Sequence, residues 1–127
     1  MAYKVFISSA IKDIDLARDL SRRLKEAGVV VYSVEKAAVP GEAIFNKIIL
    51  DLGRADEVLV ILTENSVDNP NLMYELGAAS SLRKRVTPVI VGLEPGDLPA
   101  PIKNMNYVKY SNLGKYISDL EKRANAA

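Results

Sequence analysis

The most hydrophobic stretch of this 127-residue chain is Val58-Leu59-Val60-Ile61-Leu62. It is as long as an ordinary strand, and its aliphatic side chains leave it no polar face. A parallel strand in a sheet that is covered by helices on both sides has this composition. We therefore expect residues 58–62 to form the central strand of the domain.

Similar short runs on either side of this stretch alternate with segments of helical periodicity. The predicted strands lie at 3–7, 29–32, 58–62, 86–91 and 106–110. The predicted helices run from Asp13 to Ala27, along the stripe Ile44, Ile48, Ile49 and Leu52, from Asn69-Pro70 to about Arg85, and from Leu113 to Ala124. The alternation predicts one α/β domain over 1–127. It is a flavodoxin-like three-layer sandwich whose five-stranded parallel sheet has the order 2-1-3-4-5, with helices on both faces.

Local features carry narrower expectations. Asp13 has a side chain suited to cap the first helix, and Gly28 is suited to end it. Pro88 favours an edge position or an irregular start for its strand, because proline cannot donate to a ladder. The prolines between Leu93 and Pro101 predict a loop there.

The composition excludes several classes of chemistry. The chain has no Cys and no His, so it has no disulfide, thiol nucleophile, Ser–His triad or His-ligated metal. Its 17 Lys and Arg against 16 Asp and Glu give a net charge of +1, which does not favour nucleic acid or an anionic membrane as partner. The apolar runs are too short to span a bilayer, and the first residues do not resemble a signal peptide. We therefore expect a cytoplasmic protein.

The predicted strand order also predicts where a ligand binds. In open parallel sheets, ligands bind outside the carboxyl ends of the strands where the order reverses, here between the first and third strands. That rule points to Ser8-Ser9-Ala10, the loop 34–42 and the segment 63–75. Neither a P-loop nor a G-x-G-x-x-G motif is present, and no acidic residues end the first strand to hold magnesium.

Glu75 is the candidate for chemistry in this site. It lies on the shoulder of the apolar stripe of its predicted helix, with Asn71 one turn before it on the same side. No basic residue stands three or four positions away from it. The pattern alone leaves two interpretations open. Glu75 is either a functional carboxylate or a structural one that bonds a neighbouring strand's backbone or a distant Lys or Arg.

Several boxes of sequence resemble those of a Toll/interleukin-1 receptor (TIR) domain, most closely a bacterial one. They are Val5-Phe6-Ile7-Ser8-Ser9 followed by Asp13, Pro40-Gly41-Glu42, the stretch from Ala55 to Thr63, and the stretch from Thr63 to Leu76. Their order and spacing, over Tyr3 to Leu120, carry the resemblance. Glu75 stands where the family has the Glu of its third helix, and Asn71 stands where many members have Trp.

The resemblance implies an enzyme that acts on NAD+. Many members of the family cleave NAD+ at the nicotinamide–ribose bond and release nicotinamide with linear or cyclic ADP-ribose, in bacterial immune or stress signalling. Glu75 is then the catalytic carboxylate, NAD+ is the substrate, and no separate cofactor or metal is needed. Strand-end geometry adds the expected substrate-binding residues Ser8, Ser9, Ala10, Lys36, Gly41 and Ile44, and the position one turn before Glu75 adds Asn71. Structural alternatives stay open for Ser8 and Ser9 as loop caps, Gly41 as a turn residue and Ile44 as core.

One carboxylate is enough for this reaction. Nicotinamide is already cationic in NAD+, so it leaves as a neutral molecule without a general acid. Glycosidases that act on sugar ethers need a second carboxyl group for that purpose. The remaining carboxylate stabilises the positive charge that develops on the ribose.

Other functions stay open at this point. Members of the family also act as adaptors, and we expect self-association through the loop Val34–Glu42 and neighbouring helices. The segments Ala55-Asp56 and Tyr74-Glu75-Leu76-Gly77-Ala78 also resemble 2-deoxyribosyltransferases, in which a Glu acts as nucleophile.

Overall fold

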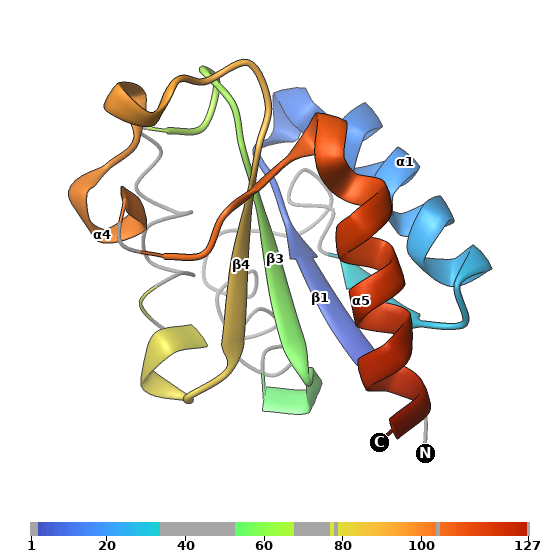
Figure 1. The fold of residues 1–127 in the computed structure, drawn as a ribbon. Helices are drawn as coiled ribbons and strands as arrows, with labels where there is room; N and C mark the ends of the chain where they lie inside the picture. Colours follow the sequence, from blue (N-terminus) through green and yellow to red (C-terminus); the bar gives the residue numbers. More distant parts are fainter. Residues whose placement is uncertain (1–2, 34–52, 68–76, 78, 104, 127) are drawn as a thin grey trace.

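A computed structural model of the chain describes residues 3–33, 53–67, 77, 79–103 and 105–126 (Figure 1). Its strands are β1 (Lys4–Ser8), β2 (Val30–Ser33), β3 (Glu57–Leu62), β4 (Arg85–Ile90) and β5 (Val108–Lys109). Its α-helices are α1 (Ile14–Glu26), α4 (Ala100–Lys103) and α5 (Leu113–Ala126), and 3-10 turns lie at Ile11–Asp13, Pro95–Asp97 and Tyr110–Asn112. Residues 53–54, 77 and 79–81 are also helical.

The strands form one parallel sheet in the order β2-β1-β3-β4-β5. The prediction of the fold class and of the strand order is therefore confirmed. β3 lies in the middle of the sheet, and every one of its residues is buried. Its apolar stretch is central because only a strand with neighbours on both edges and helices on both faces buries a run without a polar face.

Alternate residues of the central strands pack on opposite sides of the sheet. Leu59 and Ile61 pack with apolar residues of α1 and α5, such as Leu20, Leu24 and Leu113. Figure 1 shows these two helices side by side on one face of the sheet. On the other face, the core consists of Phe6, Ala55, Val58, Val60, Leu62, Ala79, Ile90, Leu98 and Ile102. The two cores make the molecule a three-layer sandwich, as the sequence predicts.

The helix that was expected to run to Arg85 ends earlier. Residues 79–81 are helical, Leu82 and Arg83 form a turn, and β4 begins at Arg85. Arg83 has a positive φ of 58°, while Lys84 N–H donates to the carbonyl of Ala79 (3.1 Å) and Arg83 N–H to that of Ser80 (3.0 Å). This pair of bonds is the Schellman ending, which usually has glycine at the left-handed position. An arginine there carries no sequence signal for the end of a helix.

Two further local expectations need correction. β4 is an interior strand, but β5 pairs only with its last residues, Val89 and Ile90, so Pro88 has a strand neighbour only on the β3 side. Proline is tolerated there because no ladder bond to β5 is lost. The segment Leu93–Pro101 is not a plain loop, because it contains the 3-10 turn Pro95–Asp97 and the start of α4. Proline in the first turn of a helix is favourable, so these prolines start short helices rather than prevent them.

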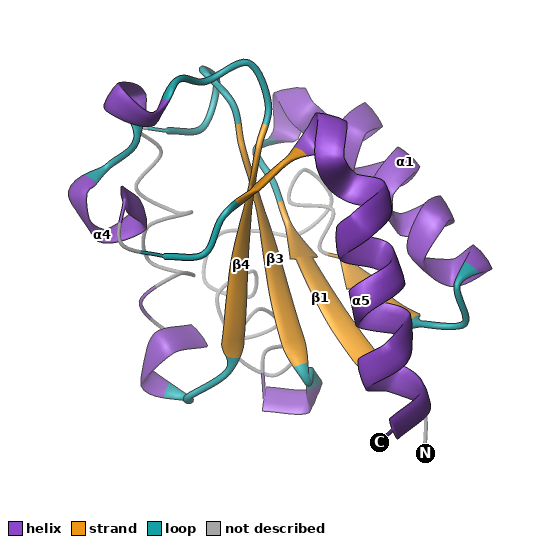
Figure 2. Cartoon of the chain, viewed as in Figure 1, coloured by secondary structure: helices purple, strands orange, loops and turns teal. Residues whose placement is uncertain are grey.

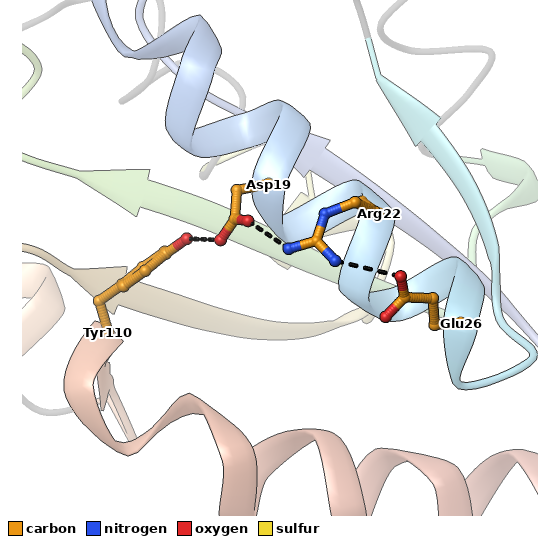
Figure 3. A network of polar contacts seen from close by, with 4 residues as sticks. All are labelled: Asp19, Arg22, Glu26 and Tyr110. Atoms are coloured by element: carbon orange, nitrogen blue, oxygen red, sulfur yellow. Dashed lines mark hydrogen bonds and ion pairs between the residues drawn. The ribbon is translucent and has the colours of Figure 1, made fainter.

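Polar side chains tie the 3-10 turn Tyr110–Asn112, which leads into α5, to α1 (Figure 3). The Tyr110 hydroxyl donates to the Asp19 carboxylate, and Arg22 bridges Asp19 (2.7 Å) and Glu26 (3.1 Å) along α1. The hydrogen bond from Tyr110, followed by the one from Arg22, lowers the pKa of Asp19 below its usual value. Because Asp19 is more acidic in the folded chain than in the unfolded one, its ionised form stabilises the fold.

We expect Tyr110→Phe to lower the free energy of unfolding at neutral pH by about 1 kcal/mol, because it removes a hydrogen bond to a partly exposed carboxylate. A carboxyl group with a lowered pKa contributes stability above its unfolded value, near pH 4, and loses it as the pH falls through the folded pKa. The gap between wild type and variant should therefore close as the pH falls below about 4. Urea unfolding at neutral and at acidic pH measures this gap.

Tyr107→Phe is the matched control, because the Tyr107 ring is half-buried in the other core and its hydroxyl has no hydrogen-bond partner among the described residues. A gap for Tyr110→Phe that stays constant down to acidic pH would contradict the role of Asp19.

No described helix combines the length and the apolar character that crossing a bilayer requires.

Candidate functional site

The carboxyl ends of β1 and β3 lie next to each other, as the predicted site requires. Ser8, the last residue of β1, is in register with Val60 of β3, and Thr63 directly follows the end of β3. In Figure 2 the loops that follow β3 and β4 lie at the upper end of the sheet, where α1 also begins. We call this end of the sheet, at the carboxyl ends of the strands, the carboxyl edge. The strand order reverses between β1 and β3.

Three of the predicted substrate-binding residues belong to the described part of the chain. Ser8 and Ala10 are buried, with 2% and 5% of their surface exposed, and Ser9 between them is half-buried. Of these three residues, only Ser9 therefore keeps part of its surface accessible to solvent at this edge. The other predicted site residues lie outside the described residues; they are Lys36, Gly41, Ile44, Asn71 and the candidate catalytic residue Glu75.

A buried carboxylate joins the two loops at the carboxyl edge. Asp13 is 4% exposed, and its two oxygens accept hydrogen bonds from Thr63 Oγ1 (2.8 Å) and from Asn65 Nδ2 (3.0 Å). The donors follow β3, whereas Asp13 follows β1. A single side chain thus connects the segments that flank the point where the strand order reverses.

The turn that follows β3 is itself held by hydroxyl groups. Thr63 N–H donates to Ser66 Oγ (2.9 Å), and Asn65 N–H donates to Thr63 Oγ1 (3.0 Å). Ser66 is fully buried, and its hydroxyl reaches back to the carbonyl of Ile61 (3.3 Å). We call Asp13, Thr63, Asn65 and Ser66 the edge cluster.

The prediction that Asp13 caps the first helix is wrong for its side chain. Asp13 does occupy the position before α1, but it makes no side-chain capping bond. Its carboxylate is used by Thr63 and Asn65, which offer two donors in a buried place. The sequence does hold a signal for this pairing, since Asp13, Thr63 and Asn65 are polar residues that lie within five positions of the ends of two strands that the predicted order makes neighbours.

The opposite end of the sheet carries a buried ion pair that the sequence did not indicate. Glu57, the first residue of β3, has no exposed surface and accepts hydrogen bonds from Tyr3 (2.9 Å), Tyr116 and Arg123 (3.0 and 3.1 Å). The guanidinium of Arg123 also lies over the Tyr116 ring, 5.7 Å from its centre. We call these residues the amino-edge cluster, and it joins the two ends of the described chain to β3.

Burial and the contacts with Glu57 shift the pKa values of two residues in the amino-edge cluster. Burial and the hydrogen bond to Glu57 raise the pKa of Tyr3. Burial acts to lower the pKa of Arg123, but the charge and hydrogen bonds of Glu57, together with the contact with Tyr3, outweigh it and the net shift is upward. The arginine is therefore held in its charged form. The cluster lies at the end of the sheet away from the predicted site, which indicates a structural role.

Among the residues that the structure describes, no group of acidic side chains is placed to hold a metal ion. One hollow lined by described residues lies at the ends of β4 and β5, between Ile90–Glu94 and Lys109–Ser111. It faces the same end of the sheet as the edge cluster but lies two strands away from β1.

The sequence matches the family model of the TIR domain over residues 5–123. The chain belongs to the TIR domain family. The match spans all five strands except the first residue of β1, and most of α5, so the edge cluster and the amino-edge cluster both lie within this TIR domain, apart from Tyr3. Among curated proteins, a search finds no match to the chain.

Solved structures of similar fold include both receptors and enzymes. The TIR domain of the Toll-related receptor TRR-2 from Hydra magnipapillata has a TM-score of 0.71 and 19% identity, over 96% of this chain and 94% of that one. A 2-deoxyribosyltransferase from Bacillus psychrosaccharolyticus has a TM-score of 0.72 and 18% identity, over 93% and 90%. A CMP N-glycosidase from Clostridium botulinum has a TM-score of 0.60 and 20% identity, over 94% and 98%. At these identities the likeness concerns the fold alone.

Proposed function

We propose that this TIR domain cleaves NAD+ at the bond between nicotinamide and ribose, with Glu75 as the carboxylate that stabilises the ribose cation. The observation that carries the proposal is the match to the TIR family over residues 5–123. The strand order supports it, because it brings the segments after β1 and β3 to one edge of the sheet. Glu75 follows the second of these segments in sequence.

The composition supports the same chemistry. The chain has no histidine and no cysteine, so it is suited to a reaction that needs neither an imidazole as general base nor a thiol as nucleophile. The nicotinamide ring of NAD+ is cationic and leaves the ribose as a neutral molecule, so its departure needs no proton donor. A single carboxylate near the ribose then acts on the charge that develops in the transition state, which is the efficient place for electrostatic stabilisation.

A second candidate function is transfer or hydrolysis at the N-glycosidic bond of a nucleoside or nucleotide. The similar structures favour it, since one is named as a 2-deoxyribosyltransferase and another as a CMP N-glycosidase. In that reaction Glu75 acts as a nucleophile on the sugar rather than as an electrostatic partner. The family match favours NAD+ as the substrate.

The test is incubation of the purified protein with NAD+ at several protein concentrations, with nicotinamide and the ADP-ribose products separated by chromatography and identified by mass spectrometry. We expect nicotinamide to appear, with a rate per molecule that rises with protein concentration if assembly through the loop Val34–Glu42 completes the site. A parallel reaction with a deoxynucleoside and a free base tests the second candidate. Folded protein that forms oligomers but releases no nicotinamide at any concentration would instead support a scaffold role.

A further inference from the structure

We propose that Asp13 is a positioning residue of the candidate site: it holds the turn 63–67 against the turn after β1 and so sets the spacing between the two sides of the carboxyl edge. The inference rests on the proposed function for its kinetic consequence. Its structural part rests only on the contacts of the edge cluster.

The first argument is the burial and the bonding of this carboxylate. Asp13 is 4% exposed, and both donors that it accepts from, Thr63 and Asn65, belong to the segment that follows β3. A buried carboxylate requires hydrogen bonds to offset its lost hydration. Asp13 therefore needs the donors of the turn 63–67. If the turn moved away, the buried carboxylate would lose these hydrogen bonds and would be left unsatisfied.

The second argument is that the Thr63 hydroxyl connects Asp13 to the backbone of the turn. The hydroxyl of Thr63 donates to Asp13 and at the same time accepts from the N–H of Asn65 (3.0 Å). A hydroxyl has one hydrogen to donate, and Thr63 donates it in the hydrogen bond to Asp13. The lone pairs of the hydroxyl oxygen therefore remain available to accept from the N–H of Asn65. The carboxylate thus orients the Thr63 hydroxyl, and the hydroxyl orients the backbone of the turn.

The third argument is the place of the edge cluster. It lies between the ends of β1 and β3, where the strand order reverses, and the turn that it holds leads into the segment that carries Glu75. Catalysis by a single positioned charge is sensitive to misplacement, and a shift of about 1 Å costs up to about a hundredfold in rate. A residue that fixes this turn is expected to act on kcat more than on KM.

The chain offers a matched control for Asp13. Asp56 also joins β1 to the β3 segment, because its carboxylate accepts from the N–H of Lys4 (2.8 Å), but it lies at the amino end of these strands. Asp56→Asn makes the same chemical change as Asp13→Asn, but at the end of the sheet opposite to the candidate site. Thr63→Val removes the hydroxyl of the edge cluster, and Thr63→Ser retains it.

The experiment measures backbone amide exchange by NMR and steady-state NAD+ cleavage for these four variants, at a temperature where each is folded. We expect the amides of residues 63 and 65 to exchange about tenfold faster in Asp13→Asn and Thr63→Val, with kcat at least about tenfold lower and KM changed less than about threefold. Thr63→Ser and Asp56→Asn should stay close to wild type in both measurements.

Several results would overturn the inference. Unchanged exchange at Thr63 and Asn65 in Asp13→Asn would show that Asp13 does not hold the turn. Faster exchange with an unchanged kcat, or an equal fall of kcat in Asp56→Asn, would show that the turn has no particular role in the reaction. If the wild type releases no nicotinamide, the proposed function fails, and the exchange comparison alone decides whether Asp13 positions the turn.

Discussion

Glu75→Gln is expected to lower the rate of nicotinamide release by about a hundredfold or more, which is the usual loss when one preorganised electrostatic group is removed from an active site. The neutral amide has nearly the shape of the carboxylate but does not stabilise a ribose cation. The fall should appear in kcat rather than in KM, because the charge on the ribose exists only in the transition state. Initial rates of nicotinamide release over a range of NAD+ concentrations separate the two parameters.

The matched control is Glu121→Gln, which makes the same change on an exposed position of α5. Its rate should equal that of the wild type. Equal activity in Glu75→Gln and wild type would remove Glu75 from the mechanism and leave the TIR fold without its proposed catalytic group.

Arg123→Leu is expected to lower the free energy of unfolding by about 3 kcal/mol, because it leaves the buried carboxylate of Glu57 without its only charged partner among the described residues. The hydroxyls of Tyr3 and Tyr116 still donate to Glu57, but they bring no positive charge. Chemical denaturation followed by circular dichroism measures the loss.

Two further variants separate the buried charge from simple loss of packing. Glu57→Gln in the Arg123→Leu background should recover a large part of the loss, since no uncompensated charge then remains. Arg22→Leu should cost much less than Arg123→Leu, because the Arg22 side chain is 60% exposed and its ion pairs lie on the surface of α1, where solvent screens them. An equal loss in Arg22→Leu and Arg123→Leu would contradict a special role for the amino-edge cluster.

The carboxyl edge shows how far sequence patterns reach. The rule for parallel sheets correctly predicts that Ser8 and Thr63 come to the same end of neighbouring strands. It does not predict that Ser8 is buried while Ser9 reaches the surface, because that depends on how the turn after β1 packs. The roles of Glu75 and Asn71 stay predictions, since both residues lie outside the described part of the chain.

The sequence by itself determined the alternation of strands and helices, the central place of residues 58–62, and the exclusion of thiol and imidazole chemistry. These properties follow from periodicity and composition, which are local or additive. Only the tertiary structure decided that Asp13 bonds Thr63, 50 residues away, instead of capping its own helix, and that Glu57 pairs with Arg123 across 66 residues. A buried carboxylate takes whichever donors the packed strands bring to it, and the distance along the chain does not enter that choice.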